Sequence, residues 1–251
     1  MKKICIVGDS HTQKMGYVTA KIFQSKSKFH EFKEIQNIIF SHENQIKKST
    51  YIDNGIEVEV EDNHYVNLHQ NLYEVVDSDV SVSLYSFPGY SAYSFNYNDN
   101  KHFEEWNKPG NIIMPCLGYI DIKNHFPIHD NADETAKKYV EKTIQKFDKA
   151  EVVFLEPFPQ FVAYLTMRWV TPKADAYFDF EERHHQHILF MQALKKYSKI
   201  YGLREPISIA KILGFDWMEP FTQSKKIPMI YNDHALPEYY EKIVRELMKY
   251  E

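Results

Sequence analysis

A short apolar run that ends in a glycine turn and leads into a helix is the feature that most constrains this chain. Residues 4–7 are continuously apolar, Gly8 ends the run, and residues 14–24 carry apolar side chains at helical spacing. A continuous apolar run is typical of a strand that helices cover on both faces of a parallel sheet. Open α/β sheets bind their ligands at the carboxyl ends of the strands, and the turn places Ser10 there.

The same pattern recurs along the chain and predicts the fold class. Strands are predicted at residues 35–40, 80–87, 111–117 and 151–155, and further helices at residues 133–149, 180–201, 207–213 and 237–250. Pro115 within the third of these strands predicts a bulge or a lost ladder hydrogen bond. Strands that alternate with helices indicate a mainly parallel sheet covered on both faces. With 251 residues, the chain is predicted to form a single α/β domain over residues 1–251.

One segment departs from the parallel pattern. Residues 47–52 and 56–61 flank Asp53-Asn54-Gly55, a turn signal, and residues 56–61 alternate strictly between apolar and acidic side chains. This alternation is typical of a strand with one face in water, so we predict a β-hairpin insertion at about residues 47–61, outside the parallel core. Two placements are open: an edge of the sheet, or a flap over the site.

Composition excludes several classes of partner. The formal net charge is −5 and the sequence pI is about 6.2, so no nucleic-acid partner is predicted. No apolar run has the length of a membrane span, and the run at residues 4–7 is too short for a signal peptide. Cys5 and Cys116 lie in strand-like apolar runs and are expected to be reduced, which makes the cytoplasm the expected location. The 18 Tyr and 17 Phe residues indicate either core packing or a groove for sugar rings.

The predicted helix at residues 180–201 contains three histidines that are candidate metal ligands. His184 and His187 share a face, but His185 does not. Because no carboxylate stands at a metal-binding spacing, this pattern favours a solvated face, and no metal or cofactor is predicted.

Polar turns follow three predicted strands, and a polar loop precedes the last helix. They are Gly8-Asp9-Ser10, Pro88-Gly89-Tyr90, Gly118-Tyr119-Ile120-Asp121 and Tyr231-Asn232-Asp233-His234. In this order they resemble the motifs of the SGNH, or GDSL-like, hydrolase superfamily: Gly-Asp-Ser after the first strand, a glycine turn, a Gly-x-Asn-Asp turn, and Asp-x-x-His before the last helix. The resemblance implies a flavodoxin-like, three-layer α/β/α sandwich. It also implies hydrolysis or transfer of acyl groups, often acetyl esters on carbohydrates.

The resemblance also implies catalytic roles. Ser10 would be the nucleophile and His234 the general base, with the backbone N–H groups of Ser10 and Gly89 as oxyanion donors. The chemistry is consistent, because a serine hydroxyl is a weak nucleophile until an imidazole accepts its proton. The tetrahedral oxyanion also needs fixed donors. The alternative is that Ser10 only caps the helix that follows.

Two positions depart from the superfamily pattern. Ile120 stands where the pattern has the oxyanion-binding Asn, and Tyr231 stands where the triad Asp is usual, three residues before His234. Asp233 is adjacent to His234 instead. Two arrangements are open: Asp233 orients His234, or a Ser-His dyad is helped by a backbone carbonyl.

The third turn also resembles a subgroup of SGNH-like proteins associated with polysaccharide biosynthesis. In that subgroup the turn has the sequence Gly-x-Ile-Asp-x-Arg-x-His, and here Lys123 replaces the Arg, which weakens any bidentate contact with a carboxylate. The comparison implies that Asp121, Lys123, His125 and Arg183 line the substrate pocket. The alternative is that Asp121 caps its turn and His125 is a surface residue.

Ser10 is flanked by two further candidates for substrate contact, Asp9 and His11. For His11, capping or a surface position is an equally open interpretation.

Three functional hypotheses follow. The first is a serine-dependent acyl ester hydrolase of the O-acetyl esterase type that acts on a glycan or a related small ester. The second is an O-acyltransferase in polysaccharide biosynthesis, in which an activated acyl donor and a sugar hydroxyl replace water. The third is a glycan-binding protein without turnover. The expected partner is an acylated carbohydrate or another small ester.

Overall fold

The computed structural model describes residues 2–24, 47–53, 56–62, 71–76, 80–87, 90–97, 102–129, 131–158, 180–214, 229–230, 234–235 and 237–250. The described strands are β1 (Lys2–Gly8), β2 (Lys47–Asp53), β3 (Ile56–Asp62), β4 (Asn71–Val76), β5 (Val80–Ser86), β6 (Asn111–Cys116), β7 (Glu151–Val152), β8 (Met229–Ile230) and β9 (His234–Ala235). The helices are α1 (Ser10–Gln24), α3 (His102–Trp106), α4 (Phe126–His129), α5 (Ala132–Lys146), α6 (Phe180–Ile200), α7 (Ile209–Leu213) and α8 (Pro237–Leu247), with a π-helical turn η2 (Asp121–His125) before α4.

The central sheet has five described strands in the order β4-β5-β1-β6-β7. Strand β1 lies in the middle and pairs in parallel with β5 and β6, so that Ile4 lies beside Val82 and Ile112. Strand β7 is also parallel, whereas β4 is an antiparallel edge strand. A central parallel strand is covered on both faces, which explains why residues 4–7 are all apolar.

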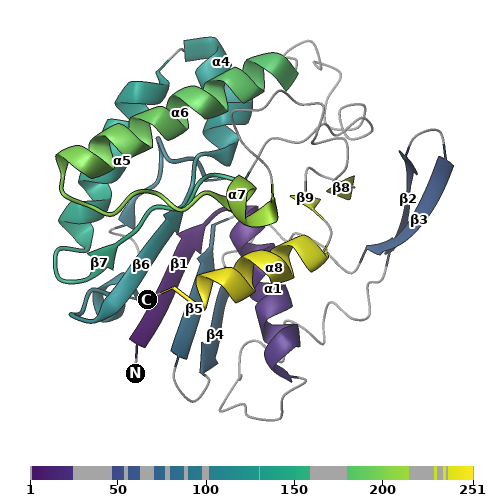
Figure 1. Cartoon of the computed structure of the whole chain (residues 1–251), viewed down its shortest axis with the longest axis horizontal. Coiled ribbons are helices and arrows are strands. Elements are labelled where there is room, and N and C mark those ends of the chain that lie inside the picture. Colours follow the sequence, from purple (N-terminus) through teal and green to yellow (C-terminus); the bar gives the residue numbers. More distant parts are fainter. Residues whose placement is uncertain are drawn as a thin grey trace.

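Alternate side chains of β1 enter two separate cores. Ile4 and Ile6 pack with residues of α1, α7 and α8, including Met15 of α1 and Tyr240 of α8. Cys5 and Val7 pack on the other face with residues of α3, α5 and α6. Figure 1 shows α1 and α8 together on one side of the sheet, with α5 and α6 on the other. The predicted three-layer α/β/α fold is therefore confirmed.

Pro115 does not disturb the pairing of β6 with β1, but it ends the hydrogen-bond ladder between β6 and β7. The register between β1 and β6 continues through the pair Val7–Pro115, so of the two predicted alternatives the bulge is wrong and the lost ladder hydrogen bond, on the β7 side, is confirmed. The Pro115 carbonyl accepts a hydrogen bond from Leu155 N–H at 2.8 Å, but proline has no N–H with which to return one. Strand β7 accordingly ends at Val152, and Leu155 makes an isolated bridge with Ile207 instead.

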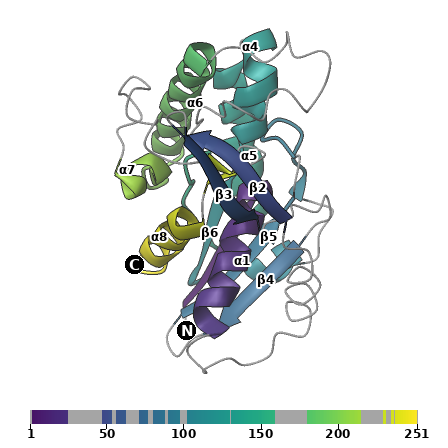
Figure 2. The same cartoon turned by 90° about the vertical axis from the view of Figure 1, so that its right-hand side faces the viewer.

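The predicted hairpin is confirmed as β2 and β3, which pair in antiparallel register from Lys47–Asp62 to Asp53–Ile56. They form a two-stranded sheet of their own, so the predicted placement at an edge of the main sheet is wrong among the described strands. Figure 1 shows the hairpin to the right of the five-stranded sheet, and in Figure 2, viewed from that side, it lies in front of the sheet. Its proposed role as a flap stays a prediction.

Most predicted elements agree with the structure to within a few residues. The helix predicted at residues 207–213 begins at Ile209, because the Ser208 side chain accepts the Lys211 N–H at 3.1 Å as an N-cap. It ends at Gly214, whose φ of +92° is a left-handed C-cap. Strand β4 was not predicted, and the strand predicted at residues 35–40 lies outside the described residues.

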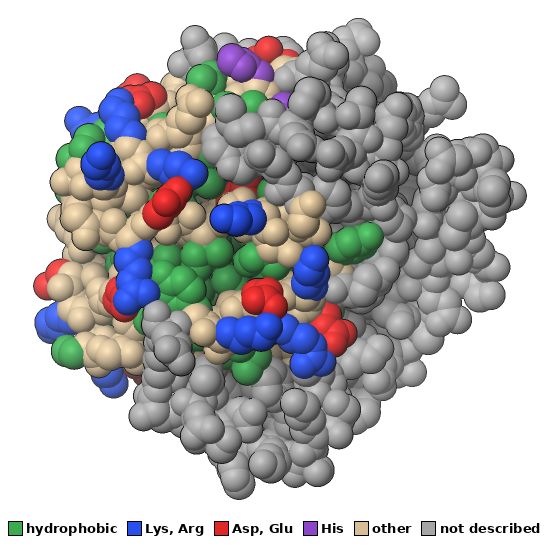
Figure 3. Space-filling view, viewed as in Figure 1, with side chains coloured by type: hydrophobic (Ala, Val, Ile, Leu, Met, Phe, Trp, Pro, Cys, Tyr) green, Lys and Arg blue, Asp and Glu red, His purple; other side chains and the backbone are tan. Residues whose placement is uncertain are grey.

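The described surface carries interspersed charges. Figure 3 shows basic and acidic side chains interspersed on one face. The ion pairs of the described surface include Lys138–Glu134 and Arg245–Glu241. Within the described part of the chain, no helix has both the length and the apolar character needed to cross a bilayer.

Candidate active site

The turn after β1 brings Ser10 to the carboxyl end of the central strand. Gly8 is the last residue of β1, and Ser10 is the first residue of α1, with its side chain half-buried. Asp9 accepts the N–H groups of Thr12 and Gln13 at its backbone carbonyl, at 3.1 and 3.4 Å, and Ser10 lies beside them at the positive end of the helix dipole. A negative charge that forms near Ser10 Oγ is therefore stabilised by the local backbone.

Gly8 is required by close packing at this turn. A Cβ atom at Gly8 would lie 2.2 Å from Thr12 Oγ1 and 2.5 Å from the carbonyl oxygen of Cys116. These distances are too short for any side chain, so the glycine lets the first turn of α1 and the end of β6 approach β1. The first residue of the Gly-Asp-Ser motif thus has a steric cause.

Asp9 is buried within the turn. Its Oδ1 accepts the His11 N–H at 2.9 Å, which fixes the backbone on both sides of Ser10. The pKa of Asp9 is raised to about 7, chiefly by burial and also by the nearby carboxyl group of Asp121, against the lowering effect of the His11 N–H. Substrate contact by Asp9 stays a prediction.

His11 lies in the interior and connects three parts of the fold. Its Nδ1 is 2.8 Å from the Tyr240 hydroxyl of α8, and its ring stacks on Phe158 at a centroid distance of 4.4 Å. Tyr119 meets the ring edge-on, also at 4.4 Å. The side chain has no exposed surface, so this placement favours support of the Ser10 turn over the surface position considered from sequence.

Asp121 joins two loops at the carboxyl edge of the sheet. It is fully buried, and its two carboxylate oxygens accept the N–H of Ala92 at 2.5 Å and the N–H of Tyr93 at 3.2 Å. Burial raises the pKa of Asp121, while these N–H groups and His125 oppose the rise. The carboxylate therefore caps the loop that follows β5, and this loop also contains the proposed oxyanion donor at residue 89.

The turn between β6 and η2 depends on Gly118. Its φ is +122°, and a Cβ atom there would lie 2.6 Å from Cε1 of Phe190 and 2.9 Å from Cγ of Pro157. Farther along η2, His125 is 41% exposed at its side chain and its Nδ1 lies 3.5 Å from Asp121 Oδ1. Asp121 and His125 are therefore neighbours on one face of η2, and their implied role in lining a substrate pocket stays a prediction. The side chain of Lys123 lies outside the described set.

A second buried carboxylate lies at the same edge and was not predicted. Oε1 of Glu156 is 2.7 Å from Nε2 of His187 on α6, and Oε2 accepts the Ser208 hydroxyl at 2.7 Å and the Ala210 N–H at 2.8 Å. The expected solvated face is thus wrong for His187, which is 2% exposed. A glutamate directly after a buried strand, in a proline-rich turn, was the available signal.

The thiol of Cys116, at the end of β6, is an alternative candidate nucleophile. Burial raises the pKa of its thiol well above the ordinary range, and the negative charges of Asp9 and Glu156 add to this rise. A buried, protonated thiol is a poor nucleophile. Among the described side chains here, Ser10 is the better candidate.

Arg183 lies near the beginning of α6 and is 2% exposed. Helix α6 packs against η2 and α4, so Arg183 lies at the same end of the fold as Asp121 and His125. The implied role of Arg183 in lining a substrate pocket stays a prediction.

The C-terminal part of the candidate site is described only for its backbone. His234 begins β9, which pairs in antiparallel register with β8. The side chain of His234, together with Asp233 and Gly89, lies outside the described residues.

Comparison with known proteins identifies relatives of the fold. No family model and no curated protein matches the sequence. One similar solved structure is Est24, a carbohydrate acetylesterase from Sinorhizobium meliloti, with 11% identity, 99% of this chain and 97% of that chain covered, and a TM-score of 0.50. Another is a variant of Axe2, an acetyl-xylooligosaccharide esterase from Geobacillus stearothermophilus, with 9% identity, 99% and 93% covered, and a TM-score of 0.50. The shared property is the fold.

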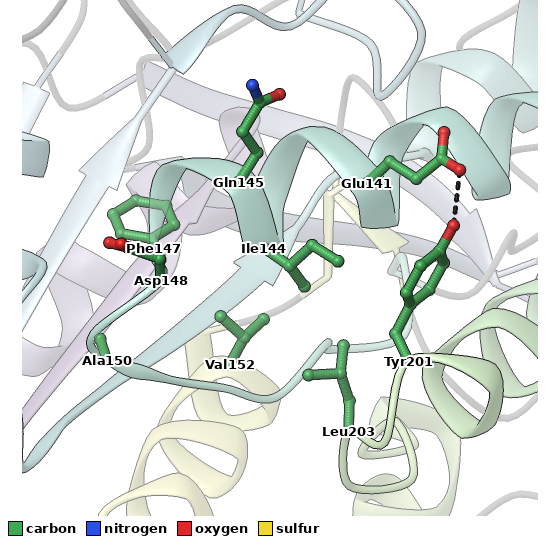
Figure 4. A pocket seen from close by; sticks show the side chains of 9 residues that line it. All are labelled: Glu141, Ile144, Gln145, Phe147, Asp148, Ala150, Val152, Tyr201 and Leu203. Atoms are coloured by element: carbon green, nitrogen blue, oxygen red, sulfur yellow. Dashed lines mark hydrogen bonds between the residues drawn. The ribbon is translucent and has the colours of Figure 1, made fainter.

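A surface cavity of about 540 Å³ opens at the other end of the sheet. It lies between the end of α5, the beginning of β7 and the turn after α6, and Figure 4 shows Val152 and Leu203 among the side chains that line it. Tyr201 donates a hydrogen bond to Glu141 at 2.5 Å across its rim. Because it adjoins the amino end of β7, this cavity is separate from the candidate active site.

Proposed function

We propose that this chain is a serine-dependent acyl ester hydrolase of the SGNH type, an O-acetyl esterase that acts on a glycan or a related small ester. The observation that carries the proposal is the position of Ser10, which begins α1 at the carboxyl end of the central strand. The fold similarity to two carbohydrate acetylesterases supports it.

In the proposed reaction, Ser10 Oγ attacks the carbonyl carbon of the ester while His234 accepts the hydroxyl proton. The oxyanion binds the N–H groups of Ser10 and Gly89, at the positive end of the α1 dipole. His234 returns the proton to the leaving sugar oxygen, and the acyl group stays on Ser10. A water molecule, deprotonated by His234, then attacks the acyl-enzyme and releases the acid and Ser10. In this mechanism Asp233 orients His234.

In this mechanism Asp121 positions the loop that contains Gly89. Its carboxylate holds the N–H groups of Ala92 and Tyr93, three and four residues beyond Gly89. By fixing this loop against the turn after β6, Asp121 fixes the direction of the second oxyanion donor.

The test compares ester turnover by the wild type, Ser10→Ala and Ser94→Ala. Ser94 is an exposed serine in the loop after β5, so its variant controls for loss of a nearby hydroxyl. With p-nitrophenyl acetate and acetylated xylo-oligosaccharides, Ser10→Ala should lower kcat by at least about 10³-fold, in the range seen when a nucleophilic serine is removed. The Ser94→Ala variant should retain activity. Equal turnover by wild type and Ser10→Ala, with both folded by circular dichroism, would exclude Ser10 as the nucleophile.

An O-acyltransferase is the second candidate, because the segment from Gly118 to His125 resembles the polysaccharide-biosynthesis subgroup and the Asp121–His125 pair lies at this edge. It shares the nucleophile and the base but transfers the acyl group to a sugar hydroxyl. Incubation with an activated acyl donor, with and without candidate glycans, separates the two. Transfer predicts acylated glycan in excess of free acid, whereas hydrolysis predicts free acid whether or not a glycan is present.

A further inference from the structure

A buried cation near the beginning of α6 has no counter-charge among the described side chains. Arg183 is 2% exposed, yet none of the ion pairs among the described residues includes it, and its Nε has no hydrogen-bond partner there. A guanidinium is charged at all physiological pH values, so it cannot neutralise itself by losing a proton. Burying an unpaired charge costs several kcal/mol in a real protein. Such a group indicates a ligand anion that completes the site.

The buried face of α6 defines where this anion would bind. Phe190 packs at Gly118, and His187 binds Glu156 just after β7. Arg183 precedes His187 by one turn on the same face, about 6 Å further along the helix axis. Helical side chains point toward the helix N-terminus, so the guanidinium extends past the carboxyl ends of β6 and β7, toward the edge of the sheet that carries Ser10.

The described carboxylates nearest to Arg183 along the chain and in the fold are bound to other groups. Both carboxylate oxygens of Glu156 are already occupied by His187, Ser208 and Ala210. Glu182, the next residue along α6, accepts a hydrogen bond from the Gln186 side chain at 2.9 Å. The buried Nδ1 of His187 likewise has no partner among the described residues, so a second polar atom on this face is open to a ligand.

We propose that Arg183 binds an anionic group of the substrate, a carboxylate or a phosphate, so that the enzyme prefers esters of acidic glycans. This inference rests on the proposed function for the reaction itself. Arginine suits the role, because its planar fork matches the oxygens of carboxylate and phosphate.

Turnover of two matched esters tests the preference. Acetylated methyl galacturonoside carries a carboxylate that acetylated methyl galactoside lacks. Arg183→Gln should lower kcat/KM for the acidic ester by roughly 10- to 100-fold, as expected for loss of a charge-assisted hydrogen bond, and have a much smaller effect on kcat/KM for the neutral ester. Arg245→Gln is the control, because it removes the same charge from an exposed ion pair on α8. Equal losses for both esters, or no loss for either, would overturn the proposal.

Binding without turnover separates this inference from the proposed function. Calorimetry with sodium galacturonate and, in a second arm, inorganic phosphate should show binding to wild type and to Ser10→Ala, and none to Arg183→Gln. The arm that binds identifies the anion. If neither ester is hydrolysed but this binding persists, the esterase proposal fails and the anion site stands. No binding of either anion to folded wild type would overturn the site.

The urea-unfolding midpoint of the ligand-free protein distinguishes a ligand-binding Arg183 from one that only stabilises the fold. A buried guanidinium without a partner destabilises the ligand-free protein, so Arg183→Gln should keep or raise the midpoint of urea unfolding. A lowered midpoint with unchanged ligand affinity would show that Arg183 holds the fold together instead. Arg183→Lys retains the charge without the fork and should bind the anion at intermediate strength.

Discussion

Replacing Gly118 by alanine tests the turn that supports the carboxyl edge of the sheet. The residue has a φ of +122°, which costs an L-residue about 1–3 kcal/mol. The new methyl group would lie 2.6 Å from Cε1 of Phe190 and 2.9 Å from Cγ of Pro157. Because Phe190 is fully buried and the proline ring is rigid, neither group can retreat freely, and overpacking adds about 1–3 kcal/mol.

Gly118→Ala should therefore lower the free energy of unfolding by about 2–6 kcal/mol, the sum of the two costs. Gly110→Ala is the matched control, because Gly110 has a φ of +85° but no atom within 4 Å of the added Cβ. It should lose only the backbone cost, about 1–2 kcal/mol. Equilibrium urea unfolding followed by far-UV circular dichroism measures both.

The difference between the two variants isolates the steric contribution. Adding Phe190→Leu to Gly118→Ala should recover part of the loss, because it shortens the side chain that the new methyl group meets, and a double-mutant cycle measures this coupling. If Gly118→Ala costs no more than Gly110→Ala, and the cycle shows no coupling, the packing of α6 on this turn is not as described.

Three further predictions concern the two turns that carry the site. Gly8→Ala should cost at least about 2 kcal/mol, because its Cβ would meet the Cys116 carbonyl oxygen at 2.5 Å, and unfolding midpoints should show this. Asp121→Asn should lower kcat more than it raises KM, because the amide can no longer accept both the Ala92 and Tyr93 N–H groups, so steady-state kinetics that show a change in KM alone would contradict the positioning role. The pKa of Asp9 is raised from 3.8 to about 7, so the folded state holds its proton more tightly than the unfolded state. The stability that protonated Asp9 contributes is fully present below pH 3.8 and is lost as the pH rises to about 7, so the free energy of unfolding falls by up to about 4 kcal/mol over this range. Asp9→Asn should remove this part of the pH dependence of urea unfolding.

The parallel core was predictable because burial on both faces leaves a strong local signal. Residues 4–7 form an apolar run, and the structure places them in the central strand with parallel neighbours on both sides. The hairpin was predictable for the opposite reason, since the alternation in β3 marks one wet face. Strand β4 was not predicted, because it pairs on one side only, at the edge of the sheet, and its sequence lacks both signals.

Contacts between distant residues left no comparable signal. Nothing near Asp121 in the sequence shows that its carboxylate binds the backbone of Ala92 and Tyr93, about 30 residues earlier. The Glu156–His187 pair joins a strand end to a helix across 31 positions, and the histidine cluster around it favoured a solvated face. Such pairings are decided by how helices pack on the sheet, which the local pattern does not encode.

The candidate site likewise has features that the local sequence predicts and features that depend on distant residues. The position of Ser10 followed from the strand, the glycine and the helix that surround it, all of which are local. The burial of His11 did not, because it depends on Tyr240 of the last helix and on Phe158.

The central claim is that Ser10 is a nucleophile activated by His234. A fluorophosphonate probe followed by intact-mass spectrometry and peptide mapping tests it most directly, because the probe labels a serine only when a base activates its hydroxyl. We predict one adduct per chain, located on Ser10 and abolished in folded Ser10→Ala and His234→Ala variants. A folded wild-type protein that stays unlabelled, or one labelled at a residue other than Ser10, would contradict the account.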